Sequence, residues 1–152
     1  MALTLCLLAL KAKRPPGARF VVWPRMDQKT CAKCVLAAGL ELVPVPLALP
    51  AGRDSPAADL AAIEAAIAAC GGPDAVVAVL TTTSCFAPRA PDDVVGVAKL
   101  AARLGVGHII NNAYGVQAET LCAAVCAAWR RGRVDAVVQV GGQGGAKGRL
   151  KG

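Results

Sequence analysis

The segment HIINNAYG at residues 108–115 decides the predicted fold, because a short β-branched run ends there in two adjacent carboxamides, Asn111 and Asn112. A short apolar run that is followed by polar and glycine residues is typical of a buried strand. In open α/β sheets, ligands bind at the carboxyl ends of the parallel strands. We therefore expect the two asparagines to lie at a ligand-binding edge of a sheet.

Polar runs follow apolar strands at two further places, WPRMDQKTC at residues 23–31 and TTTSCFAPR at residues 81–89. Along the whole chain, apolar and polar stretches alternate as in repeated β-then-α units, which predicts a mostly parallel sheet with helices on both faces. The expected strands are residues 20–23, 41–45, 75–80, 108–110 and 136–140. The expected helices are residues 28–38, 56–69, 91–104 and 118–131.

Local signals mark the helix ends. Asp27, Ser55–Pro56 and Pro91–Asp92–Asp93 are expected to open three helices, since carboxylates and hydroxyls accept hydrogen bonds from exposed amides. Glycines at positions 39, 71, 72 and 105 are expected to end three helices. The apolar run at residues 3–10 is too short to span a bilayer and is expected to be the buried end of a helix.

Composition predicts one globular domain. The chain has 152 residues, 55% of them hydrophobic and only 3% aromatic, so the core must be built from small aliphatic side chains. Seven cysteines form an odd number with no secretion signal, which favours free thiols in the cytoplasm and no membrane association.

The net charge of +7 is concentrated in two basic stretches, residues 11–33 and 130–151. Two basic ends are suited to an RNA backbone, which is bound largely through its charge. The alternative is that these are ordinary solvated lysines and arginines.

Together, these segments resemble the O-phosphoseryl-tRNA(Sec) selenium transferase family. The resemblance covers nearly everything from Leu3 to Gln139. It implies that residues 1–139 are the central part of a pyridoxal-phosphate-dependent transferase (fold type I) large domain, and that residues 140–152 are a glycine-rich tail outside the family pattern. It further implies pyridoxal 5'-phosphate as cofactor, tRNA(Sec) carrying O-phosphoserine and selenophosphate as substrates, and a homotetramer.

The activity that the resemblance implies is conversion of O-phosphoseryl-tRNA(Sec) to selenocysteinyl-tRNA(Sec), by β-elimination of phosphate and addition of selenium. The family has a Schiff-base lysine after the last strand. Here Gln143 aligns with that lysine, or the lysine segment is deleted, so covalent attachment of the cofactor at that position is not expected. We therefore expect this chain alone to be incomplete for catalysis. The alternative is a truncated, non-catalytic module that binds tRNA(Sec) or full-length subunits.

The resemblance assigns roles to three residues. Asn111 matches the residue beside the pyridine nitrogen of the cofactor, Gln28 matches a glutamine near its ring, and Arg130 matches a basic residue that contacts tRNA. Each has a structural alternative: a turn-capping asparagine, an unremarkable glutamine, and a cation at a helix carboxyl terminus.

Other polar residues carry weaker signals. The residues Thr81, Thr82, Thr83, Ser84 and Arg89 have a composition suited to phosphate oxygens, without assignable contacts. A catalytic pair of Cys85 and His108 has no supporting signature. The cysteines at positions 31, 34, 122 and 126 are better explained as buried small side chains than as a zinc site.

Overall fold

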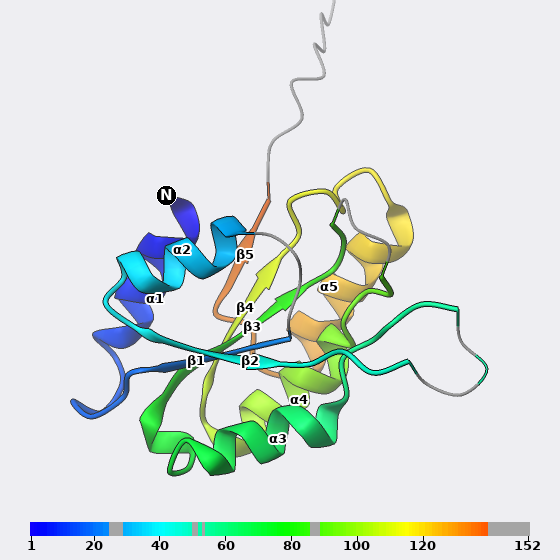
Figure 1. Ribbon diagram of the computed structural model, residues 1–152. Helices are drawn as coiled ribbons and strands as arrows, with labels where there is room; N and C mark the ends of the chain where they lie inside the picture. The colour runs from blue at the N-terminus through cyan, green and yellow to red at the C-terminus, as the bar shows by residue number, and fades with distance from the viewer. Residues whose placement is uncertain (25–28, 50–51, 53, 86–88, 140–152) are drawn as a thin grey trace, which may run out of the picture.

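The described residues form one five-stranded sheet in which every strand pair is parallel (Figure 1). The computed structural model describes residues 1–24, 29–49, 52, 54–85 and 89–139. The strands are β1 (Phe20–Pro24), β2 (Glu41–Val45), β3 (Val76–Thr82), β4 (Gly107–Asn111) and β5 (Ala136–Val138), and their spatial order is β2-β1-β3-β4-β5.

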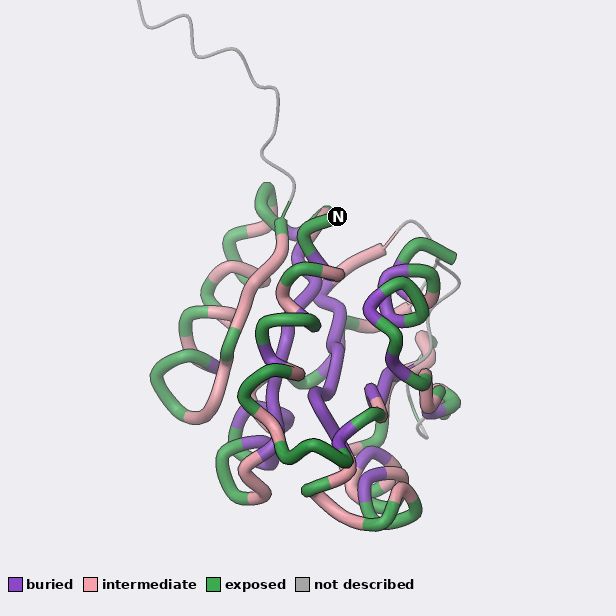
Figure 2. Tube along the Cα trace, turned by 90° about the vertical axis from the view of Figure 1, so that its left-hand side faces the viewer, coloured by how far each residue is buried: buried purple, intermediate pink, exposed green. Residues whose placement is uncertain are grey.

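Helices cover both faces of the sheet, as predicted (Figures 1 and 2). On one face, α1 (Ala2–Lys11) and α2 (Lys29–Ala37) pack on Val21, Leu80 and Ile109. On the other face lie α3 (Leu60–Ala69), α4 (Val94–Leu104) and α5 (Glu119–Arg131), and a short 3-10 helix, η1 (Pro73–Ala75), precedes β3. The predicted α/β class is therefore confirmed.

The centre of the sheet is completely buried. All seven residues of β3 and all five of β4 are buried, whereas β5 at the edge is only half-buried. The register sets Thr82 of β3 opposite Asn111 of β4, and Asn111 opposite Val138 of β5. These three strands therefore end at the same level, which brings the loops that follow them together.

The helix ends test the local predictions. The Asp93 carboxylate accepts a hydrogen bond from the amide of Gly96 at 2.9 Å, as a residue that opens a helix should. Gly39 and Gly105 have φ values of +64° and +71°, in the left-handed region that glycine tolerates. The predicted start at Asp27 lies outside the described residues.

The prediction that Ser55–Pro56 opens a helix is wrong. The helix α3 begins at Leu60, and its cap is Asp59, whose carboxylate accepts from the Ala61 amide at 2.9 Å. Upstream, Ala57 pairs with Ala48 in an isolated antiparallel bridge. This pairing with a residue nine positions earlier holds the segment extended, so the local Ser-Pro signal is overridden.

The amino-terminal apolar run forms most of α1. Its residues Leu3, Leu7 and Leu10 are buried against the sheet, while Leu5 and Leu8 are exposed, so one face of the helix contributes to the core. None of the helices in the described part of the chain combines the length and the apolar character that crossing a bilayer requires.

Candidate functional site

Asn111 is the last residue of β4 and is 4% exposed. Its carboxamide oxygen Oδ1 accepts the amide hydrogen of Ala113 at 3.2 Å, which is the turn-capping role that a strand-end asparagine commonly has. Its amide nitrogen Nδ2 donates to Sγ of Cys31 at 3.3 Å. Asn111 therefore both closes the turn after β4 and joins β4 to the first turn of α2.

Gln28 lies outside the described residues. The residue that follows it, Lys29, begins α2, and the hydrogen bond between Cys31 and Asn111 places the first turn of this helix against the end of β4. The structure therefore places the start of α2, which follows Gln28 in the sequence, beside Asn111.

Cys31 is a protonated thiol. It is 1% exposed, and burial raises the pKa of this thiol above its ordinary value. The hydrogen bond from Asn111 acts in the opposite direction, while the nearby thiols of Cys34 and Cys85 raise the pKa further. Asn111 thus contacts a neutral, buried thiol on this side of the sheet.

Asn112 faces the opposite side of the sheet, because successive strand residues alternate. Its Oδ1 accepts the hydroxyl hydrogen of Thr83 at 2.5 Å, and its Nδ2 donates to Oε1 of Gln139 at 3.1 Å. We call this chain of three side chains the amide ladder. It joins the residues that follow β3, β4 and β5. The sequence shows a polar residue after each of these strands, but not that they contact one another.

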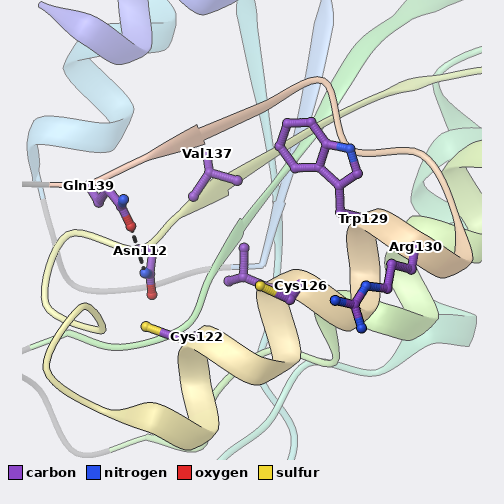
Figure 3. A pocket seen from close by; sticks show the side chains of 8 residues that line it. Asn112, Cys122, Cys126, Trp129, Arg130, Val137 and Gln139 are labelled. Carbon is purple, nitrogen blue, oxygen red and sulfur yellow. Dashed lines mark hydrogen bonds between the residues drawn. The ribbon is translucent and has the colours of Figure 1, made fainter.

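The amide ladder borders an open groove of about 440 Å³ between α5 and β5 (Figure 3). Asn112 and Gln139 lie at one end of the groove, and Trp129 and Arg130 at the other. Trp129 is 61% exposed. The complete lining is Asn112, Cys122, Val125, Cys126, Trp129, Arg130, Val137 and Gln139.

Arg130 and Asn111 are not brought together. Arg130 lies in the last turn of α5, on the side of the sheet that Asn112 faces, whereas Asn111 contacts α2 on the other side. Two basic residues, Arg130 and Arg131, occupy this last turn and are exposed. A cation at a helix carboxyl terminus is also favoured electrostatically, so the structural role predicted for Arg130 is present.

One hydroxyl near the end of β3 and one directly after it are used inside the protein. The Thr81 hydroxyl is 2.9 Å from Nε2 of His108, and the Thr83 hydroxyl belongs to the amide ladder. Nδ1 of His108 is 3.0 Å from the Arg133 carbonyl oxygen, which can only accept, so Nδ1 carries the hydrogen and Nε2 accepts from Thr81. Burial lowers the pKa of His108 to about 4. Both ring nitrogens of His108 are engaged, so it is not held as a base for Cys85.

Arg89 forms a buried ion pair with Asp92, whose Oδ2 also accepts the Thr82 amide hydrogen at 2.7 Å. Burial raises the pKa of Asp92 to about 6, against the opposing effect of Arg89. In the described structure, Nη1 of Arg89 and Oγ of Ser84 are buried without a hydrogen-bond partner. Such donors suit anionic oxygens.

All seven cysteines are thiols outside any disulfide. Cys31 and Cys34 are buried, as predicted, and Cys122 is half-buried. The prediction is wrong for Cys126, which is exposed on the groove side of α5. Within the described ranges, no group of three or more histidine, cysteine or acidic side chains is arranged to hold a metal ion.

Comparisons with known proteins identify the family. The family model described as "O-phosphoseryl-tRNA(Sec) selenium transferase, SepSecS" matches residues 1–144. The selenium transferase of Dictyostelium discoideum is 42% identical over 141 residues, which cover 91% of this chain and 28% of the relative. That of Leishmania donovani is 42% identical over 160 residues, covering 84% of this chain and 27% of the relative.

Solved structures agree with the sequence comparisons. The crystal structure of an archaeal O-phosphoseryl-tRNA(Sec) selenium transferase matches with a TM-score of 0.75 and 30% identity, over 90% of this chain and 31% of that one. The Oryza sativa TDC structure with PLP matches with a TM-score of 0.66 and 19% identity, over 85% of this chain and 30% of that one, which shows a shared fold. The chain spans about 28% of the length of its curated relatives. The chain belongs to the O-phosphoseryl-tRNA(Sec) selenium transferase family.

Proposed function

We propose that this chain forms part of a transferase that converts O-phosphoseryl-tRNA(Sec) to selenocysteinyl-tRNA(Sec), with selenophosphate as the selenium donor and pyridoxal 5'-phosphate as the cofactor. The observation that carries the proposal is the buried Asn111 carboxamide at the carboxyl end of β4, bonded to the first turn of α2, directly after Gln28. Ligands of open α/β sheets bind at this edge.

The donor set at this edge fits a phosphate-bearing aromatic cofactor. Ser84 Oγ and Arg89 Nη1 follow β3 and are buried donors without partners in the described structure, and a buried donor left unpaired costs about 1–3 kcal/mol. Asn111 has one amide hydrogen beyond the hydrogen that it donates to Cys31. Asn111 and Gln28 would hold the ring, and Ser84 and Arg89 are suited to its phosphate.

When bound, pyridoxal phosphate supplies an electron sink for loss of the α-proton and of the phosphate from phosphoserine. Asn111 contributes a neutral hydrogen bond beside the ring nitrogen, in place of the charge that an aspartate would supply. A neutral partner makes a weaker sink, and phosphate is a good leaving group, so we expect the weaker sink to suffice. Gln28 and Asn111 would bind and orient the ring, and neither is proposed to transfer a proton.

The proposed partner is tRNA(Sec), and the proposed assembly is a homotetramer. The proposed location is the cytoplasm, whose reducing conditions suit seven cysteines outside any disulfide. Arg130, exposed in the last turn of α5, is the proposed contact to the tRNA backbone. The neighbouring Arg131 adds to the positive charge there, and such charges attract RNA without reading its sequence.

A second candidate function is a non-catalytic module that binds tRNA(Sec) or full-length subunits. The groove between α5 and β5 favours it, because an exposed tryptophan and apolar walls beside Arg130 are features of surfaces that bind other macromolecules. Light scattering of this chain mixed with a full-length family member would show a shift in mass if this function is correct.

A chimaera tests the main proposal. Residues 1–139 of this chain would replace the matching segment of the Dictyostelium discoideum transferase, which is 42% identical. We expect the chimaera to form selenocysteinyl-tRNA(Sec) from phosphoseryl-tRNA(Sec) and selenophosphate, and an Asn111→Leu version to lose at least about tenfold in rate. The matched control is Asn112→Leu, which alters the neighbouring carboxamide on the opposite side of the sheet. A folded chimaera without activity would contradict the proposal.

A further inference from the structure

We propose that Cys31 is a positioning residue for Asn111: its sulfur holds the amide nitrogen of the Asn111 carboxamide, so that this carboxamide keeps one orientation toward the cofactor. The inference rests on the proposed function, in which Asn111 lies beside the ring nitrogen. It adds a residue that acts through Asn111 and touches no reacting atom.

The orientation of the carboxamide follows from the two groups that it contacts. The amide of Ala113 can only donate a hydrogen bond, so it selects Oδ1 of Asn111, 3.2 Å away. The opposite end of the carboxamide, Nδ2, then faces Sγ of Cys31 at 3.3 Å. Turned by half a rotation, the carboxamide would set two donors against each other at Ala113.

Burial gives this contact its effect. Cys31 is 1% exposed and Asn111 is 4% exposed, so water does not replace either partner. Burial also raises the pKa of the thiol and so keeps it protonated. The neutral sulfur is a weak acceptor, and it accepts the amide hydrogen of Asn111. A weak hydrogen bond that solvent cannot exchange is enough to favour one rotamer of a buried amide.

These two contacts determine which donor and acceptor positions of the Asn111 carboxamide are left for a ligand. Nδ2 carries two hydrogens, of which Cys31 takes one, and Oδ1 has one lone pair beyond the Ala113 contact. Anchored at both ends, the carboxamide offers its second amide hydrogen to a ring nitrogen that accepts. Without the sulfur, only the Ala113 contact remains, and the carboxamide can swing about its terminal torsion, which is intrinsically soft.

The test compares Cys31→Ala and Cys31→Ser with the wild-type chain. The matched control is Cys34→Ala, which removes a second buried thiol one turn further along α2. Two probes are titrated by calorimetry: pyridoxamine 5'-phosphate, which has no aldehyde to react with surface lysines, and its 1-deaza analogue, which lacks the ring nitrogen. Nuclear magnetic resonance follows hydrogen exchange of the Asn111 side-chain amide in the same samples.

We expect Cys31→Ala to speed exchange of the Asn111 amide and to weaken pyridoxamine 5'-phosphate about three- to tenfold, with the 1-deaza analogue unchanged. Cys31→Ser should weaken it less, because a hydroxyl still accepts, and this variant carries the test if the alanine variant does not fold. Cys34→Ala should change neither measurement.

Two results would overturn the inference while leaving the proposed function intact: unchanged exchange of the Asn111 amide in Cys31→Ala, or equal weakening of both probes, which is what a purely structural role produces. If the wild-type chain binds neither probe although the Asn111 amide is protected, the proposed cofactor site is wrong, and Cys31 is then a structural contact only.

Discussion

Arg14 and Arg133, from the two basic ends of the chain, donate hydrogen bonds to the same carbonyl oxygen, that of Gly105, at 2.5 and 2.9 Å. Arg14 also binds the carbonyl oxygens of Pro73 and Val76, so one guanidinium ties together the segments before β3 and β4. Burial and the nearby Arg133 lower the pKa of Arg14. These two arginines are therefore structural, and neither is free to follow an RNA backbone.

Replacing Arg14 should destabilise the fold. Arg14→Met removes the cationic donor from the carbonyl oxygens of Pro73 and Val76 and leaves that of Gly105 with Arg133 alone, and we expect the free energy of unfolding to fall by about 2–4 kcal/mol. Urea unfolding followed by circular dichroism measures the change. Lys13→Met is the matched control, since Lys13 is exposed, and should change stability by less than about 0.5 kcal/mol. Equal effects of the two substitutions would show that Arg14 does not hold these segments together.

His108 should make the protein less stable in mild acid. Its folded-state pKa is depressed from 6.5 to about 4, so below pH 6.5 the unfolded chain takes up a proton that the folded protein does not. This contribution to stability is present above pH 6.5 and is lost as the pH falls towards 4. Between pH 7 and pH 5 we expect a loss of about 2 kcal/mol from this residue.

The comparison with His108→Gln isolates that contribution. The raised pKa of Asp92, about 6, acts in the opposite direction, since its contribution is lost as the pH rises through 6, but it is common to both proteins. The free energy of unfolding of the wild type should therefore fall, relative to that of His108→Gln, between pH 7 and pH 5. A difference that is independent of pH would mean that His108 titrates normally.

Gly115 should tolerate no side chain while the amide ladder is intact. A Cβ at this position would lie 2.0 Å from Oδ1 of Asn112 and 2.9 Å from the Thr83 hydroxyl. We expect Gly115→Ala to cost about 1–3 kcal/mol of stability. In an Asn112→Ala background most of this cost should disappear, because the nearest atom is gone. Additive effects in this double-mutant cycle would contradict the close approach.

Arg130 should contribute to RNA affinity through charge alone. We expect Arg130→Ala to weaken binding of tRNA(Sec) and to reduce the slope of log affinity against log salt by about 1. Filter binding at several salt concentrations measures both. The control is Arg103→Ala on α4, where the arginine is already paired with Glu64 at 2.8 Å. Equal losses for the two variants would indicate a diffuse charge effect instead of a contact at Arg130.

Much of the fold was predictable from the sequence, because hydrophobic periodicity is local. The five strands of the described structure were all located, with β1, β3 and β4 longer than expected and β5 shorter. The failures came from contacts outside the predicted element: the Ala48–Ala57 bridge overrode the Ser55–Pro56 signal, and the place of Cys126 depended on which face of α5 packs inward.

The candidate site was predictable in position but not in detail. The two carboxamides were expected at the carboxyl end of a strand, and the structure has them at the end of β4, while ligand binding there stays a prediction. Because side chains alternate along a strand, the sequence also predicts that Asn111 and Asn112 face opposite sides of the sheet. Their partners are far away in the chain: Cys31 for Asn111, and Thr83 and Gln139 for Asn112. Only the folded sheet shows which thiol and which hydroxyl each amide meets.

The alternation at the end of β4 has a mechanical consequence. Asn111 and Asn112 are joined by one rigid peptide plane, and the backbone amide of Asn112 is held by the Val138 carbonyl at 2.7 Å. The two side chains lie on opposite faces of the sheet, but the peptide plane between them is held rigidly. A movement on the groove side that tilts this plane is therefore expected to move the Asn111 side chain beside Cys31 as well.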